Sequence, residues 1–134
     1  MAQIPVAEGL FVETERGPRL RAARCRACGE LHFPGGSDCP FCGSESCEVE
    51  EIGALGKLHA GTVVRTAPPG YSGPVPYGFG LVDLDEGLRV VSALEITDDE
   101  ELVEGLRLRL VLRTVGRGDD GKDLVAWSYQ PENP

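Results

Sequence analysis

The chain has 134 residues and a formal net charge of -9, from 22 acidic and 13 basic side chains, and 41% of its residues are hydrophobic. This apolar content excludes a disordered chain, and the length suits one compact domain or a small module fused to a larger one. The acidic balance opposes nucleic-acid binding, which depends on neutralising phosphates with Lys and Arg.

The lack of a targeting signal in the sequence and the odd number of cysteines predict a cytoplasmic protein. No apolar run approaches the roughly 18 residues of a membrane-spanning helix. The first residues, Met1 to Pro5, lack the basic and apolar parts of a signal peptide. Five cysteines form an odd set, which argues against a disulfide framework and for a metal site in a reducing compartment.

Residues 1–24 show little helical periodicity. Two apolar stretches, Leu10–Val12 and Leu20–Ala22, flank Arg16–Pro18. This pattern predicts a loose hairpin, or two extended pieces, ahead of the first cysteine.

Four cysteines form two equally spaced pairs that are separated by ten residues: Cys25-x-x-Cys28 and Cys39-x-x-Cys42. Each pair can place two thiolates of one tight turn on a single ion. Gly29 and Gly43 follow the pairs, where a residue free to take positive φ is favourable. Four thiolates complete the tetrahedral shell of Zn²⁺ and leave no position for water. We therefore predict one structural zinc ion per chain.

Other interpretations of these cysteines are weaker. A redox dithiol needs one pair of cysteines, and this chain has two. Iron of the rubredoxin type uses the same four ligands and is the other alternative to zinc. Cys47 lies five residues beyond the second pair and is expected to be a small apolar filler. His32, inside the loop between the pairs, is expected to be a surface or packing residue.

After an acidic stretch that contains Glu48, Glu50 and Glu51, the glycines Gly53 and Gly56 mark a junction between modules. The rest of the chain reads as five strands, because β-branched and alternating apolar residues recur between Gly- and Pro-rich turns. The expected strands are 57–65, 77–84, 88–95, 106–113 and 124–129. The loop 66–76, with four prolines and two glycines, cannot be a central strand.

A helix of about two turns is predicted between the third and fourth strands. Thr97 and Glu100 match a capping box, and Gly105 is placed to end the helix. Three strands, a helix and two strands are in the order of an OB-fold barrel, with a plain five-stranded meander as the alternative. The expected domains are an extended segment at 1–24, a zinc ribbon at 25–52 and an OB-fold at 53–134.

The chain shows no sequence motif for catalysis. It has no Gly-x-Ser-x-Gly elbow, no phosphate-binding glycine loop and no paired histidines. His59 lies in the first predicted barrel strand, and nothing in the sequence marks it as a general base. Asp83, Asp85 and Glu86 surround a hairpin turn, where a carboxylate pair is the minor alternative to local hydrogen bonding. We expect that the chain is not an enzyme by itself.

Several short motifs carry a family resemblance that goes beyond the cysteine spacing, which many zinc ribbons share. In chain order they are Cys25-Arg26-Ala27-Cys28-Gly29, Phe33-Pro34, Cys39-Pro40-x-Cys42-Gly43, Gly53-x-x-Gly56-Lys57, the segment Pro76 to Gly87, and Gly105 to Leu108. This combination resembles the thiolase-associated zinc-ribbon/OB-fold proteins, which are small acyl-CoA-associated accessory subunits. The first 24 residues are similar to the accessory subunit of benzoylsuccinyl-CoA thiolase from anaerobic toluene degradation.

The resemblance implies a rubredoxin-like ribbon followed by an OB-fold. It also implies a thiolase-fold partner, such as a thiolase, a hydroxymethylglutaryl-CoA synthase or a steroid side-chain aldolase. We expect a non-catalytic subunit that docks on such an enzyme, in a heterotetramer, and helps shape its CoA-thioester site. The expected contacts with the partner or CoA site are Phe33, Pro34, Tyr71, Pro76, Tyr77 and Phe79.

Two other functions remain alternatives. A free-standing nucleic-acid binder is suggested by the ribbon and barrel, and by Arg107, Arg109 and Arg113 on one strand face, but the chain is acidic and poor in aromatics. An acyl-CoA-binding carrier would act without a partner.

Overall fold

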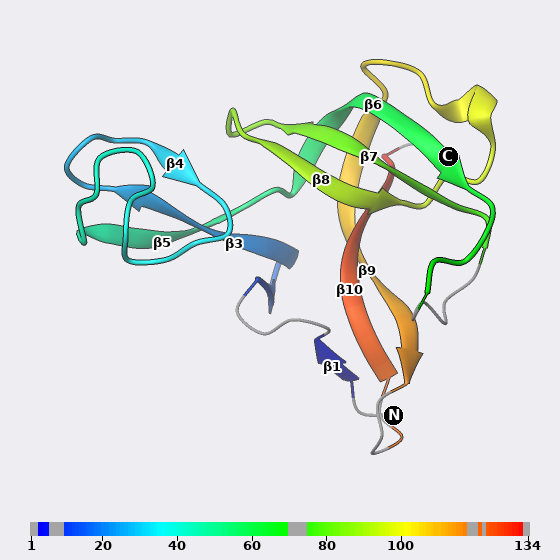
Figure 1. Cartoon of the computed structure of the whole chain (residues 1–134), viewed down its shortest axis with the longest axis horizontal. Helices are drawn as coiled ribbons and strands as arrows, with labels where there is room; N and C mark the ends of the chain where they lie inside the picture. Colours follow the sequence, from blue (N-terminus) through cyan, green and yellow to red (C-terminus); the bar gives the residue numbers. More distant parts are fainter. Residues whose placement is uncertain (1–2, 6–9, 70–74, 118–120, 122, 133–134) are drawn as a thin grey trace.

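The fold consists of two β-modules joined end to end. The structure is a computed structural model and describes residues 3–5, 10–69, 75–117, 121 and 123–132. A small sheet that holds the cysteines lies beside a larger sheet that closes into a barrel (Figure 1). The predicted fold class, a mainly β chain with a zinc ribbon followed by a five-stranded barrel, is confirmed.

The small sheet is built around one long strand. It contains β2 (Phe11–Thr14), β3 (Gly17–Cys25), β4 (Leu31–His32) and β5 (Cys47–Ile52). β2 and β3 form the hairpin that the sequence predicts, closed where Thr14 pairs with Gly17. β3 also pairs with β4 and, from Leu20 to Cys25, with β5. The hairpin and the cysteine loops therefore belong to the same sheet.

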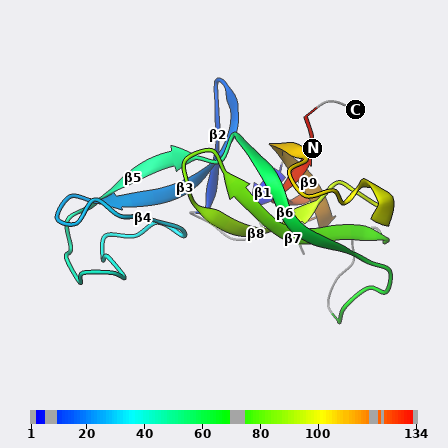
Figure 2. The same ribbon diagram turned by 90° about the horizontal axis from the view of Figure 1, so that it is seen from above.

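The barrel is closed by five strand pairings, of which four are antiparallel and one is parallel. Its strands are β6 (Leu55–Val64), β7 (Tyr77–Leu84), β8 (Arg89–Leu94), β9 (Arg107–Arg117) and β10 (Asp123–Pro131). β6, β7 and β8 follow one another, β8 pairs with β10 in parallel, and β9 joins β10 to β6. This is the strand order of an OB-fold. A short strand, β1 (Gln3–Pro5), adds to β10 (Figure 2).

The prediction of a two-turn helix that begins at Thr97 is wrong. The segment forms only a 3-10 turn, η1 (Asp99–Glu101), and its N-cap is Asp98, whose carboxylate accepts from the Glu100 amide at 3.0 Å. The connection is too short for a longer helix, since Gly105 already donates to the Leu58 carbonyl as β9 begins. Leu102 instead turns inward and packs against the core beside Gly61.

One continuous core joins the two modules. Apolar side chains of the small sheet, Leu20 and Ile52 among them, belong to the same buried cluster as the barrel interior. Tyr129 of β10 is fully buried and donates a 2.6 Å hydrogen bond to the carbonyl oxygen of Gly53, in the link between the modules. Burial raises the pKa of Tyr129 above its usual range.

β7 places glycines toward the barrel interior and aromatic side chains on the outside, whereas large apolar side chains usually face the interior. Its inward positions include Gly78 and Gly80, where a Cβ would lie 2.7 Å from the Ile96 carbonyl oxygen and 2.3 Å from the Ala60 carbonyl oxygen. Neighbouring backbone thus fills the interior, and only glycine fits. Because side chains alternate along a strand, Tyr77 and Phe79 point outward.

Candidate functional site

The four paired cysteines come together at the far end of the small sheet. Their Sγ atoms all lie within 4.8 Å of one another, with 3.5 Å from Cys25 to Cys42 and 3.6 Å from Cys28 to Cys39. A zinc ion with four sulfur ligands at the usual bond length needs sulfur–sulfur distances of about 3.8 Å. The four predicted ligands are therefore positioned to bind a metal.

Two knuckles of matching geometry hold these thiols. Gly29 and Gly43 both take φ of 79°, and their amides donate to the carbonyls of Cys25 and Cys39 at 2.9 and 3.0 Å. The Cys28 and Phe41 amides each point at the sulfur that opens their own knuckle, at 3.4 Å. Such amide donors stabilise thiolate charge. They fit a metal–thiolate centre better than four neutral thiols.

The two halves of the site differ in exposure. Cys25 and Cys39 are buried, whereas Cys28 and Cys42 are exposed. The Cys28 amide, donating to sulfur, lowers the pKa of the Cys25 thiol to about 6, although burial acts in the opposite direction. Four sulfur ligands leave no open coordination position for a substrate, so the geometry suits a structural metal rather than a catalytic one.

Cys47 borders this centre without belonging to it, and His32 lies elsewhere in the same small module. Cys47 lies on β5, paired with Cys25 across the sheet, and burial raises the pKa of its thiol to about 11. His32 is buried on β4 and packs within the small module. Neither belongs to the four-sulfur cluster found among the described residues.

Five of the six predicted contact residues are among the described residues, and they fall in two places. Phe33 is half-buried against the core, and Pro34 follows it on the surface. Pro76, Tyr77 and Phe79 lie at the start of β7, where Phe79 keeps 42% of its surface exposed. The sixth predicted contact, Tyr71, lies outside the described residues. The contact set therefore stays a prediction.

An aromatic cluster between the modules was missed by the sequence interpretation. Trp127 of β10 meets Phe11 and Phe33 edge to face, with ring centroids 6.0 and 5.7 Å apart. These rings come from opposite ends of the chain, so no local pattern signals their contact. Two of these rings, Phe11 and Trp127, line a groove of about 300 Å³ that continues onto the barrel, where Phe79 and Val91 belong to its lining.

The acidic cluster predicted near the β7–β8 turn does not form a carboxylate pair. Asp83 bonds to Arg89 at 2.6 Å, and Asp85 accepts two 3.0 Å hydrogen bonds from Arg107. Hydrogen bonds from these arginines lower the pKa of both aspartates. Each carboxylate is thus kept ionised by its own arginine. A general acid would instead have to be protonated.

Comparison with known proteins identifies the architecture. Residues 16–48 match the family domain described as the ChsH2 rubredoxin-like zinc ribbon, and residues 49–113 match the ChsH2 C-terminal OB-fold domain. A DUF35 domain-containing scaffold protein of Pyrococcus furiosus is 35% identical over 114 residues, which cover 84% of this chain and 83% of that protein. The chain belongs to the DUF35 family. The family predicted from the cysteine spacing and the segment from Pro76 to Gly87 is confirmed.

Other proteins that are similar to this chain are described as parts of enzymes. The benzoylsuccinyl-CoA thiolase subunit BbsA of Thauera aromatica is 34% identical over 121 residues, covering 86% of this chain and 78% of that protein. Among solved structures, a chain of the Ltp2–ChsH2(DUF35) aldolase superposes with a TM-score of 0.67 at 28% identity, covering 84% of both chains. No helix in the described part of the chain is long and apolar enough to cross a membrane.

Proposed function

We propose that this chain is a non-catalytic accessory subunit that binds a thiolase-fold enzyme and helps shape that enzyme's CoA-thioester site. The observation that carries the proposal is the similarity, over 86% of the chain, to a protein described as a thiolase subunit. The solved structure of an aldolase that contains a DUF35 chain adds support.

The metal centre fits this role as a structural support. Cys25, Cys28, Cys39 and Cys42 would hold one zinc ion, which stabilises a small module that has little core around its loops. The zinc would supply no Lewis-acid chemistry to a substrate, because its four positions are filled by protein sulfur. The domain boundaries at 24/25 and 52/53 remain a prediction.

Contact with the enzyme would come from the aromatic and proline residues near β7 and at the ribbon edge. Phe79 and Pro76 are exposed, and Tyr77 lies beside them at the start of β7. Phe33, Pro34 and Tyr71 complete the proposed set. Interface centres favour aromatic side chains and exclude charge, which supports this surface over the acidic remainder of the chain.

The partner would be a benzoylsuccinyl-CoA thiolase of aromatic-compound degradation, in the cytoplasm, with two copies of each subunit. The identity to BbsA proteins of Thauera aromatica, at 34%, and Geobacter metallireducens, at 28%, supports this assignment.

Co-expression with a thiolase-fold protein of the same genome tests the proposal. The two are expected to elute together on size exclusion at micromolar concentration, with a mass of two copies each. Separate elution, together with an enzyme that is fully active alone, would exclude the accessory role. Activity of the complex on benzoylsuccinyl-CoA against acetoacetyl-CoA tests the narrower assignment.

A further inference from the structure

The outer face of β7 and β8 carries an apolar strip where a barrel is expected to be polar. Antiparallel pairing sets Phe79 opposite Ala93 and Leu81 opposite Val91. All four side chains point away from the barrel interior, because their neighbours in sequence point inward. Val91 is 52% exposed and Phe79 42% exposed. We call these four residues the β7–β8 strip.

Apolar residues on the solvent face of an antiparallel sheet need an explanation. The strip opens into the groove lined by Phe11 and Trp127, so its apolar surface continues from the barrel to the ribbon side. In OB-folds, the face of the second and third strands is the usual ligand-binding face, and here these strands are β7 and β8.

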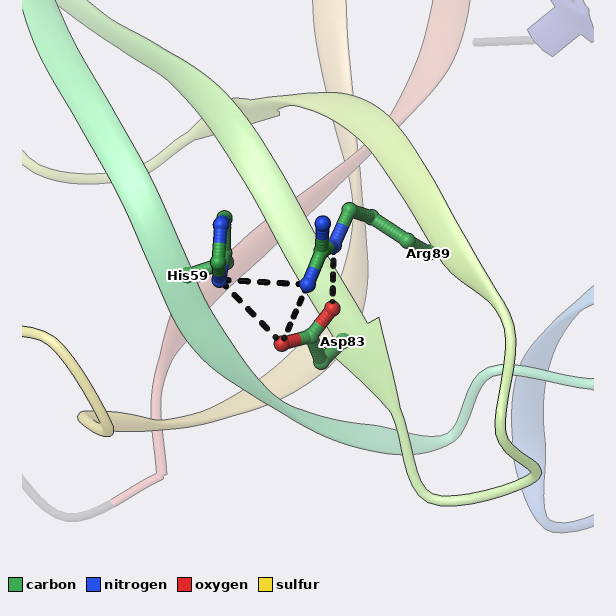
Figure 3. A network of polar contacts seen from close by, with 3 residues as sticks. All are labelled: His59, Asp83 and Arg89. Atoms are coloured by element: carbon green, nitrogen blue, oxygen red, sulfur yellow. Dashed lines mark hydrogen bonds and ion pairs between the residues drawn. The ribbon is translucent and has the colours of Figure 1, made fainter.

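A polar cluster ends the strip. The next outward-facing pair after Leu81 and Val91 is Asp83 and Arg89, which lie opposite each other on β7 and β8. His59 joins them from β6: its Nδ1 lies 3.2 Å from an Arg89 Nη and 3.5 Å from an Asp83 carboxylate oxygen (Figure 3). Arginine can only donate, so a neutral His59 accepts at Nδ1 and carries its proton on Nε2.

A β-bulge places His59 there. The pairing of β6 with β7 runs from Leu58 opposite Val82 directly to Ala60 opposite Leu81, which leaves His59 as the extra residue. Bulges bend a strand and redirect a side chain. The bulge at His59 is thus a second, independent sign that this face of the barrel has a role.

We infer that the β7–β8 strip, with His59 at its end, is the docking face for an apolar segment of the partner enzyme. The Nε2–H of His59 would donate a hydrogen bond to a carbonyl of that segment. This inference rests on the proposed accessory function and adds which surface carries it.

The charges favour an uncharged protein segment over other occupants. Asp83 and Arg89 already neutralise each other, so an apolar segment would cover the strip without burying an unpaired charge from this pair. A nucleic acid would meet a chain of net charge -9, and the strip itself contains no basic side chain. A second copy of this chain would bring another strongly acidic surface, which disfavours self-association.

Binding of a purified thiolase-fold subunit of the same genome, measured by titration calorimetry, tests the inference. Val91→Arg and Phe79→Ser are expected to weaken binding at least tenfold, as changes at the centre of an interface do. The matched control is Val103→Arg, since Val103 is 58% exposed in the connection between β8 and β9. It is expected to bind like the wild type.

His59→Ala is expected to weaken binding about fivefold through loss of one hydrogen bond. The polar control is Arg65→Ala, which removes the exposed ion pair of Arg65 with Asp99 and is expected to leave binding unchanged. All substituted side chains face solvent or the strip, so urea midpoints are expected to stay near that of the wild type. This separates binding from folding.

Tight binding of the wild type with no effect of Val91→Arg and Phe79→Ser overturns the docking face and leaves the accessory function standing. Absence of wild-type binding overturns the accessory function and this inference with it. A homodimer of the chain alone that Val91→Arg dissociates, with partner binding unchanged, assigns the strip to self-association and also overturns the inference.

Discussion

The Tyr129 hydroxyl donates a 2.6 Å hydrogen bond to the Gly53 carbonyl, 76 residues earlier in the chain. This bond fixes the link between the zinc ribbon and the barrel. Gly53 has φ of 86°, and a Cβ there would lie 2.7 Å from the Tyr129 oxygen and 3.1 Å from Leu20. The contact therefore requires glycine for both its backbone conformation and its space.

Gly53→Ala is expected to destabilise the chain more than Gly87→Ala. Gly87 also has positive φ, 95°, but a Cβ added there would meet no atom within 4 Å. Left-handed backbone costs about 1 kcal/mol for alanine at either site. The steric contact adds about 1–3 kcal/mol at Gly53 alone. Urea unfolding of both variants measures the difference, and equal losses would contradict the packed joint.

Stability is expected to decline above about pH 10 because of Tyr129. Burial raises the pKa of its phenol in the folded state, whereas the unfolded phenol ionises near pH 10. The unfolded chain then binds fewer protons than the folded one, so the free energy of unfolding falls as pH rises, by up to about 1.4 kcal/mol per pH unit. Urea unfolding of Tyr129→Phe between pH 8 and about 11 is expected to show a shallower decline. An unchanged slope would contradict this assignment.

Cys39→Ser is expected to remove the metal and the order of residues 20–45, because an incomplete thiolate shell cannot hold a module with so little core. Cys47→Ser is the matched control, since Cys47 is half-buried outside the four-sulfur cluster. We expect about one zinc per chain in the wild type and in Cys47→Ser by elemental analysis. Full zinc occupancy in Cys39→Ser would refute the four-cysteine assignment.

Purified alone, the chain is expected to show no thiolase, hydratase or hydrolase turnover on CoA thioesters. The four-sulfur site has no open position, and Asp83 and Asp85 are held charged by arginines. Across purification fractions, the measurements are loss of acetoacetyl-CoA in the presence of free CoA for thiolysis, loss of an enoyl-CoA for hydration, and release of free CoA thiol for hydrolysis. Turnover that follows the chain and disappears in a Tyr77 or Asp83 variant would contradict the non-catalytic role.

The barrel strands were predictable because their pattern is local. The segment from Tyr77 to Leu84 has the predicted bounds, since turn residues flank it on both sides. The alternation that begins at Leu106 likewise corresponds to β9. The helix prediction failed because a capping motif reports only the first turn. It carries no information on how soon Gly105 must join β6.

The candidate surfaces were less predictable because they depend on register. Cysteine spacing alone identified the four sulfurs, since each pair lies within one turn. The bulge at His59 adds one unpaired residue to β6 with no sequence signal, and it brings His59 to Asp83 and Arg89. Trp127 meets Phe11 only when the last barrel strand lies beside the first hairpin.

Titration of a thiolase-fold enzyme of the same genome with this chain tests the accessory role most directly. The enzyme, purified without this chain, is mixed with increasing amounts of it while thiolysis of the acyl-CoA substrate is followed. We predict that activity rises and reaches a plateau at one copy of this chain per enzyme subunit. Full activity before any addition, with no change up to a tenfold excess, would contradict the account.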